Sequence, residues 1–160
     1  CLVFNGVSIA QTGGIARLCG KLAGIYPDDY ILAAQTDQFL DFSTNITDLI
    51  FYASRNLGDE LKRERRHELA KGELLRNLGF LEKNIPAYNK WIVGPQIGLA
   101  DIAVWRIMGW LSGGILDGIP TTILDDFTQI RKICTAVDAE SSIQEWVEKT
   151  YPKKYHRGNF

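Results

Sequence analysis

The sequence lacks the cysteine and histidine patterns that build disulfide frameworks and zinc sites. Its three cysteines, Cys1, Cys19 and Cys134, are odd in number and widely spaced, which makes a poor set for disulfide pairing. There is no CxxC pair, and the two histidines, His67 and His156, lie far apart, so we expect no metal site. Cys19 and Cys134 stand among apolar residues and are predicted to be reduced thiols in the core.

The sequence also lacks an excess of one charge and any long apolar run. It has 18 lysines and arginines against 19 aspartates and glutamates, a formal net charge of −1, so nothing indicates a nucleic-acid partner. No apolar stretch is long enough for a transmembrane helix, and there is no secretory signal. Reduced thiols favour a cytoplasmic location. An organellar location stays open, because the chain begins at Cys1 without a methionine and its true N-terminus is expected upstream.

Strand patterns are missing from the sequence after residue 10. Before that point, two short apolar runs at residues 1–4 and 7–10 flank Asn5-Gly6, and this arrangement predicts a β-hairpin. A two-stranded hairpin is barely stable alone in water. We therefore expect it either to dock on helices or to form the edge of a sheet that lies upstream.

The rest of the chain has helical periodicity. Apolar residues recur every three or four positions in the segments that begin near Thr12, Pro27, Glu60, Leu99, Thr122 and Ser141. The third of these segments is predicted to run without interruption over residues 60–83. The sequence thus predicts a mainly α fold, a bundle of about five to six helices with the hairpin docked on it.

Two segments carry more specific patterns. Residues 7–18 read VSIAQTGGIARL, a strand that leads into a Gln-Thr pair opening a helix, and residues 92–101 read IVGPQIGLAD. The first is similar to the end of the thioredoxin-like domain of glutathione transferases, and the second to the Val-Gly-Asp segment of their helical domain. With matches at residues 45–52 and 79–83, the chain resembles the sigma, pi and mu classes over essentially its whole length.

The resemblance implies two domains. Residues 1–26 would be the end of the thioredoxin-like, glutathione-binding domain, and residues 27–160 the helical C-terminal domain. The family's catalytic Tyr, Ser or Cys and its cis-proline lie near the start of the thioredoxin-like domain. Neither has a counterpart in these residues, so no catalytic residue is assigned.

The resemblance assigns glutathione binding to Gln11 and Thr12. In the family this pair holds the γ-glutamyl end of glutathione, and a helix N-terminus suits an anion because its first N–H groups lack partners. The alternative is that Thr12 only caps the helix. Asn45 falls where several classes place an acid that contacts the glutathione amine from the partner subunit, and it would supply a neutral contact instead. Gly13 and Gly14 depart from the family's usual residues and should weaken the first turn.

A dimer interface is assigned to Arg17, Asp37 and Asp41. In the resembling dimers, an arginine at this place pairs with acids at these two places across a two-fold axis. Asp37 and Asp41 lie four residues apart and would repel each other on an isolated helix, so a cation between them is physically reasonable. The alternative is a solvated arginine and a solvated acidic face.

Two further sets of residues take their roles from the resemblance. Phe51, Tyr52 and Arg55 lie where the helical domain walls the pocket for the hydrophobic electrophile, although simple packing would explain the aromatic residues equally well. Gly98 and Asp101 match the capping box that stabilises the central helix, with glycine in place of the usual Ser or Thr.

Three functions remain open at this point. In the first, the chain belongs to a working glutathione transferase, with glutathione and a small hydrophobic electrophile as substrates and a homodimer as its assembly. It could instead be a non-catalytic transferase-like module that binds a partner protein within a larger complex. The third alternative is a binding protein that keeps only a glutathione or hydrophobic-ligand site.

Overall fold

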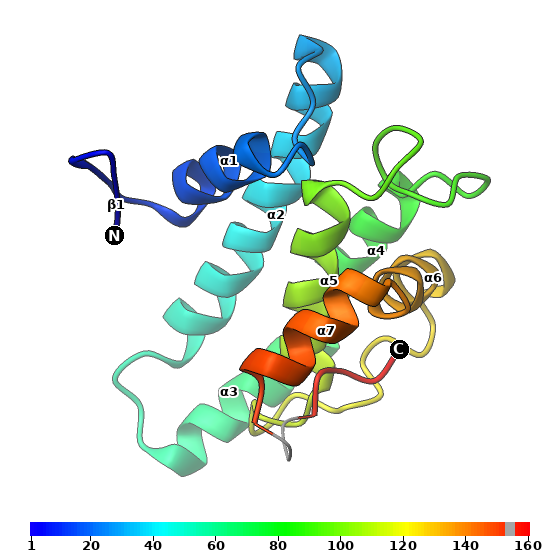
Figure 1. Ribbon diagram of the computed structural model, residues 1–160. Coiled ribbons are helices and arrows are strands. Elements are labelled where there is room, and N and C mark those ends of the chain that lie inside the picture. The colour runs from blue at the N-terminus through cyan, green and yellow to red at the C-terminus, as the bar shows by residue number, and fades with distance from the viewer. Residues whose placement is uncertain (153–155) are drawn as a thin grey trace.

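A computed structural model describes residues 1–152 and 156–160 of the chain. Its mainly α architecture confirms the predicted fold class, with one antiparallel hairpin followed by helices (Figure 1). The elements are β1 (Leu2–Phe4), β2 (Val7–Ile9), α1 (Thr12–Leu22), α2 (Tyr30–Ser54), α3 (Asp59–Lys71), α4 (Glu73–Asn84), α5 (Leu99–Ser112), α6 (Thr128–Asp138) and α7 (Ser141–Thr150). In the described part of the chain, no strand follows Ile9.

The hairpin forms where the sequence predicts it, but it does not dock on the core. Asn5 and Gly6 have φ angles of 49° and 78°, the left-handed conformation that a tight two-residue turn requires. The strands pair with Leu2 opposite Ile9. Figure 1 shows the hairpin and the start of α1 projecting away from the bundle, and no hairpin residue belongs to the core cluster. Three-residue strands offer too little apolar surface to bury, so the hairpin stays largely exposed.

The first two helices follow local signals in the sequence. α1 ends before Gly24, whose φ of 70° is the left-handed conformation common after a helix. The carboxylate of Asp29 caps α2 by accepting the N–H groups of Ile31 and Leu32, both at 2.9 Å. α2 then runs for 25 residues, about 37 Å, and forms one wall of the bundle.

The structure corrects two predicted helix boundaries. The single helix expected over residues 60–83 is broken at Gly72, whose φ of −119° and ψ of −101° are not helical, so α3 and α4 are separate elements. The helix expected near Thr122 begins at Thr128 instead, after a run of turns. Its start is fixed from outside: Glu82 on α4 accepts the N–H groups of Gln129 and Ile130 at 2.8 and 3.0 Å.

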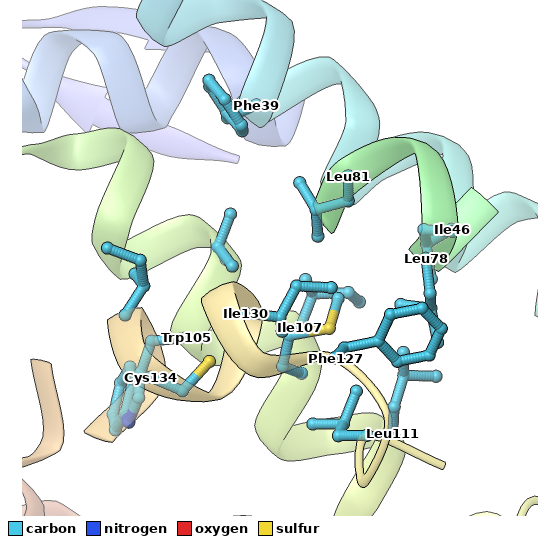
Figure 2. Close-up of a cluster of buried hydrophobic side chains, with 14 of the residues drawn as sticks. Phe39, Ile46, Leu78, Leu81, Trp105, Ile107, Leu111, Phe127, Ile130 and Cys134 are labelled. Atoms are coloured by element: carbon cyan, nitrogen blue, oxygen red, sulfur yellow. The ribbon is translucent and has the colours of Figure 1, made fainter. Parts of the chain in front are cut away.

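The hydrophobic core surrounds α5, which packs against α2 on one side and α6 on the other. Figure 2 shows the labelled core side chains of α2 (Phe39, Ile46), α4 (Leu78, Leu81), α5 (Trp105, Ile107, Leu111), the start of α6 (Phe127) and α6 itself (Ile130, Cys134). Cys134 is fully buried, and burial raises the pKa of its thiol far above the ordinary range. Cys19 was predicted to be a core thiol, but it is exposed on α1.

Candidate functional site

The predicted glutathione residues lie at the start of α1. Gln11 is the N-cap residue and Thr12 the first helical residue, so Thr12 does not cap the helix. The backbone of Gln11 has φ 68° and ψ 130°, a conformation that costs a non-glycine residue about 1–3 kcal/mol. No side chain caps the first turn, and its N–H groups have no earlier carbonyl in the helix to accept them. The turn can therefore receive an anion.

Gly13 makes room for an arginine at this first turn. A Cβ atom placed on Gly13 would lie 2.7 Å from Nη1 of Arg17, one helical turn later. The guanidinium thus occupies the space where other residues carry a side chain. This contact gives a physical reason for one of the two glycines that depart from the family pattern.

Arg17 is held by acids of its own chain. Its Nε donates to Oδ1 of Asp37 at 2.7 Å, and its Nη2 lies 3.4 Å from Oδ1 of Asp41. The hydroxyl of Tyr26 donates to the same Asp37 oxygen at 3.0 Å. The hydrogen bond to Asp37 raises the pKa of Arg17, and burial is the largest cause that raises the pKa of Tyr26. The structure thus brings Arg17, Asp37 and Asp41 together within one chain, whereas the resemblance predicts a pairing between two subunits.

Two close contacts fix α1, and hence the site, against the bundle. Gly20 is buried, and a Cβ there would lie 3.0 Å from Cδ2 of Leu99, the first residue of α5. The carbonyl of Ile25 accepts the N–H of Leu99 at 2.9 Å. The start of α5 therefore sets the position of α1, and sequence reasoning missed Gly20, Tyr26 and Ile25 because nothing local marks them.

Asn45 belongs to α2, whereas Gln11 and Thr12 belong to the start of α1. It is exposed on α2, four residues beyond Asp41, and no hydrogen bond among the described residues joins it to the start of α1. It lines an open pocket of about 520 Å³ together with Tyr52 of the same helix. The rest of that pocket comes from α2, α3 and α4, through Asp48, Leu49, Ala53, Leu69, Glu73 and Asn77.

The three predicted pocket residues cluster at the end of α2. The rings of Phe51 and Tyr52 meet edge to face with centroids 5.4 Å apart, and the guanidinium carbon of Arg55 lies 5.5 Å from the Phe51 centroid. Phe51 is 52% exposed and Tyr52 is 65% exposed, so these rings do not serve core packing. The cluster is an apolar surface with one positive charge beside it.

Asp101 supplies the only side-chain hydrogen bond of the capping box between Gly98 and Asp101. Its carboxylate accepts the N–H of Gly98 at 2.8 Å and the N–H of Ile92 at 2.8 Å, while Gly98 has no side chain to return a bond. Asp101 is completely buried, and this burial raises its pKa above the ordinary value, an effect that the backbone N–H donors oppose. The residue joins the loop before α5 to its first turn, which is a structural role.

Within residues 1–152 and 156–160, no group of three or more His, Cys, Asp or Glu side chains is placed to hold a metal ion. None of the helices described there is long and apolar enough to cross a membrane.

Comparison with known proteins places these features in a family. The family model for the glutathione S-transferase C-terminal domain matches residues 40–150, and no curated protein sequence matches the chain. Rat hPGDS complexed with a quinoline is similar in fold, with a TM-score of 0.78 at 19% identity over 95% of this chain and 73% of that one. A prostaglandin synthase D of Nilaparvata lugens gives 0.78 at 19% over 94% and 73%.

A Pi-class glutathione S-transferase of Onchocerca volvulus gives a TM-score of 0.71 at 20% identity. The alignment covers 88% of this chain but only 65% of the Onchocerca protein. At these identities the structural likeness shows the fold alone. The family model matches the sequence itself over most of the chain, and so shows the family. The chain belongs to the glutathione S-transferase family and contains that family's C-terminal helical domain.

Proposed function

We propose that this chain is part of a glutathione-binding transferase in which Gln11 and Thr12 hold the γ-glutamyl carboxylate at the start of α1. The observation that carries the proposal is the uncapped first turn after the strained Gln11 backbone. Strain of this kind persists only where the surrounding structure maintains it, and it is concentrated at ligand sites. Several N–H groups at a helix N-terminus favour an anion there.

The start of α1 cannot bind glutathione tightly by itself. A helix N-terminus contributes about 0.3–1 kcal/mol toward an exposed anion. Millimolar affinity already requires about 4 kcal/mol. The remaining contacts would have to come from the rest of a thioredoxin-like domain, which would also supply the group that stabilises the thiolate. These 160 residues alone should therefore show no useful glutathione affinity.

The electrophile would bind near Phe51, Tyr52 and Arg55. Exposed aromatic rings beside a cation suit a hydrophobic compound that gains negative charge when the thiolate attacks it. Asn45 would contribute a neutral hydrogen bond toward the glutathione of a second subunit. A charge-assisted contact at that place would be roughly twice as strong.

A homodimer through the α1–α2 face remains part of the proposal. Arg17 already has a partner in Asp37, but Asp41 is 69% exposed and its contact to Arg17 is long, at 3.4 Å. Asp41 can therefore still meet a cation of a second copy. Because Asp37 already neutralises Arg17 within the chain, Arg17 would attract an acid of a second copy less strongly.

The same observation favours a second candidate, a non-catalytic transferase-like module. An arginine satisfied within its chain does not require a symmetric copy, so this face could accept a different partner protein. Asn45 in place of an acid points the same way. Glutathione binding separates the two candidates.

Calorimetry with glutathione tests the proposal on two forms of the protein. The 160-residue chain should give no measurable heat of binding, whereas a form that also carries a thioredoxin-like segment upstream of Cys1 should bind. Thr12→Ala should weaken that binding, and Thr150→Ala on the exposed face of α7 serves as the matched control. Tight binding by the short chain would refute our account of the site. An extended form that folds and does not bind would favour the assembly module.

A further inference from the structure

Residues 156–160 lie on α5 in a groove that glycine creates, and we call these residues the strap. A Cβ atom on Gly109 would collide with the carbonyl oxygen of Arg157. One on Gly113 would lie 2.7 Å from the carbonyl oxygen of Gly109 in the helix and 2.8 Å from the carbonyl oxygen of His156 in the strap. Both positions are four residues apart, on one face at the end of α5. Only glycine at both positions lets the strap backbone approach the helix so closely.

Polar contacts fix the strap in one register. The N–H of Asn159 donates to Oγ of Ser112 at 2.8 Å, and that hydroxyl donates to the carbonyl of Met108 at 2.9 Å. Ser112 is completely buried, so the strap supplies the donor that completes its hydrogen bonding. A buried hydroxyl that loses such a partner is costly.

A charged contact ties the strap to the neighbouring helix. Nη1 of Arg157 lies 2.8 Å from Oδ1 of Asp138 at the end of α6, and the same oxygen accepts the indole N–H of Trp105 at 3.2 Å. The ion pair is about one third exposed on both sides. The strap therefore bridges α5 and α6, which pack against each other in the core.

The end of the strap is apolar and equally specific. Phe160 packs against the core, and its ring atom Cζ lies 3.5 Å from where a Cβ of Gly109 would be. Gly158 has a φ of 154°, and a Cβ there would meet both the Phe160 ring and the Cα of Gly109. Glycine is thus required on both sides of the contact, in the helix and in the strap.

We propose that this face of α5 is a binding site for an extended peptide of the type Arg-Gly-Asn-aromatic, and that the chain's own strap occupies it as a detachable closure. The peptide backbone would lie against Gly109 and Gly113, and one of its amide N–H groups would donate to Ser112. Asp138 would pair with the arginine, and the aromatic ring would pack against the hydrophobic core. Release of the strap uncovers the site without unfolding the helices, because α5 and α6 keep their own contacts.

Hydrogen exchange on the intact 160-residue chain tests the closure. The amide of Asn159 should exchange more slowly than in a free peptide, and Gly109→Ala should accelerate that exchange by about tenfold or more, because its Cβ collides with the strap backbone at Arg157. Gly79→Ala is the matched control, since a Cβ on Gly79 meets nothing within 4 Å. Unprotected Asn159 in the unchanged chain, or equal protection in Gly109→Ala, would overturn the proposal.

A second measurement tests the site itself. In a chain shortened after residue 155, the free peptide His156–Phe160 should raise the melting temperature in proportion to its concentration, and a peptide with Arg157→Ala should do so less. A shortened chain that folds and ignores both peptides at millimolar concentration would refute a binding site. Where the shortened chain does not fold, the exchange rates of the glycine variants decide the question.

Discussion

Replacing Asp101 by Asn tests how the start of the central helix is stabilised. The carboxylate is completely buried and accepts two backbone N–H groups, those of Ile92 and Gly98, both at 2.8 Å. An amide keeps one acceptor oxygen and turns an NH₂ group toward the other N–H. One buried donor then loses its acceptor and faces a second donor.

The expected loss follows from this geometry. A buried donor left without an acceptor costs about 1–3 kcal/mol, and the opposed NH₂ group adds to that. We expect Asp101→Asn to lower the free energy of unfolding by about 2–4 kcal/mol. For a chain of this size, each kcal/mol shifts the melting temperature by about 2–4 °C. The midpoint should therefore fall by about 5–15 °C.

The pH dependence has a defined sign. Burial raises the pKa of Asp101 in the folded chain above its ordinary value of 3.8. Just above that value the folded chain therefore holds a proton that the unfolded chain has lost, so the contribution of Asp101 to stability falls as the pH rises through this interval. The difference between the unchanged chain and Asp101→Asn should shrink over the same interval.

Thermal and urea unfolding followed by circular dichroism measure both effects. Asp59→Asn is the control, because the Asp59 side chain is fully exposed in the first turn of α3 and its contact to Lys62 is long, at 3.4 Å. It should change the free energy of unfolding by less than about 0.5 kcal/mol. Equal stability of Asp101→Asn and the unchanged chain would refute the capping role.

Three further predictions concern the positioning of the helices. Arg17→Glu should destabilise the chain by about 1–2 kcal/mol, because the new carboxylate would be repelled by Asp37 and Asp41. Sedimentation at low salt will show whether association weakens as well. Gly79→Ala should raise the free energy of unfolding in urea by about 1 kcal/mol, and Gly13→Ala should lack this gain because a Cβ at position 13 displaces the guanidinium of Arg17. Glu82→Gln should cost about 1–2 kcal/mol at the start of α6, and an unchanged melting temperature would contradict that role.

The sequence by itself determined the features that depend on neighbouring residues. Asn5-Gly6 specifies the hairpin turn, Asp29 caps α2, and Asp101 lies three residues after Gly98, the N-cap of its helix. The groups that make these contacts lie only a few residues apart in the chain. The local sequence is therefore enough to predict them. The mainly α fold followed from such patterns, and the family from the resemblance of residues 7–18 and 92–101. The roles of Gln11, Thr12 and Asn45 stay predictions.

Only the tertiary structure decided which distant groups meet. Arg17 reaches Asp37 within its own chain, Glu82 caps a helix that begins 46 positions later, and Asn159 donates to Ser112 across 47. No periodicity encodes such pairings, because they depend on how the helices pack around α5. The hairpin shows the converse limit: its turn is fixed locally, but its docking needs apolar surface that its short strands do not have.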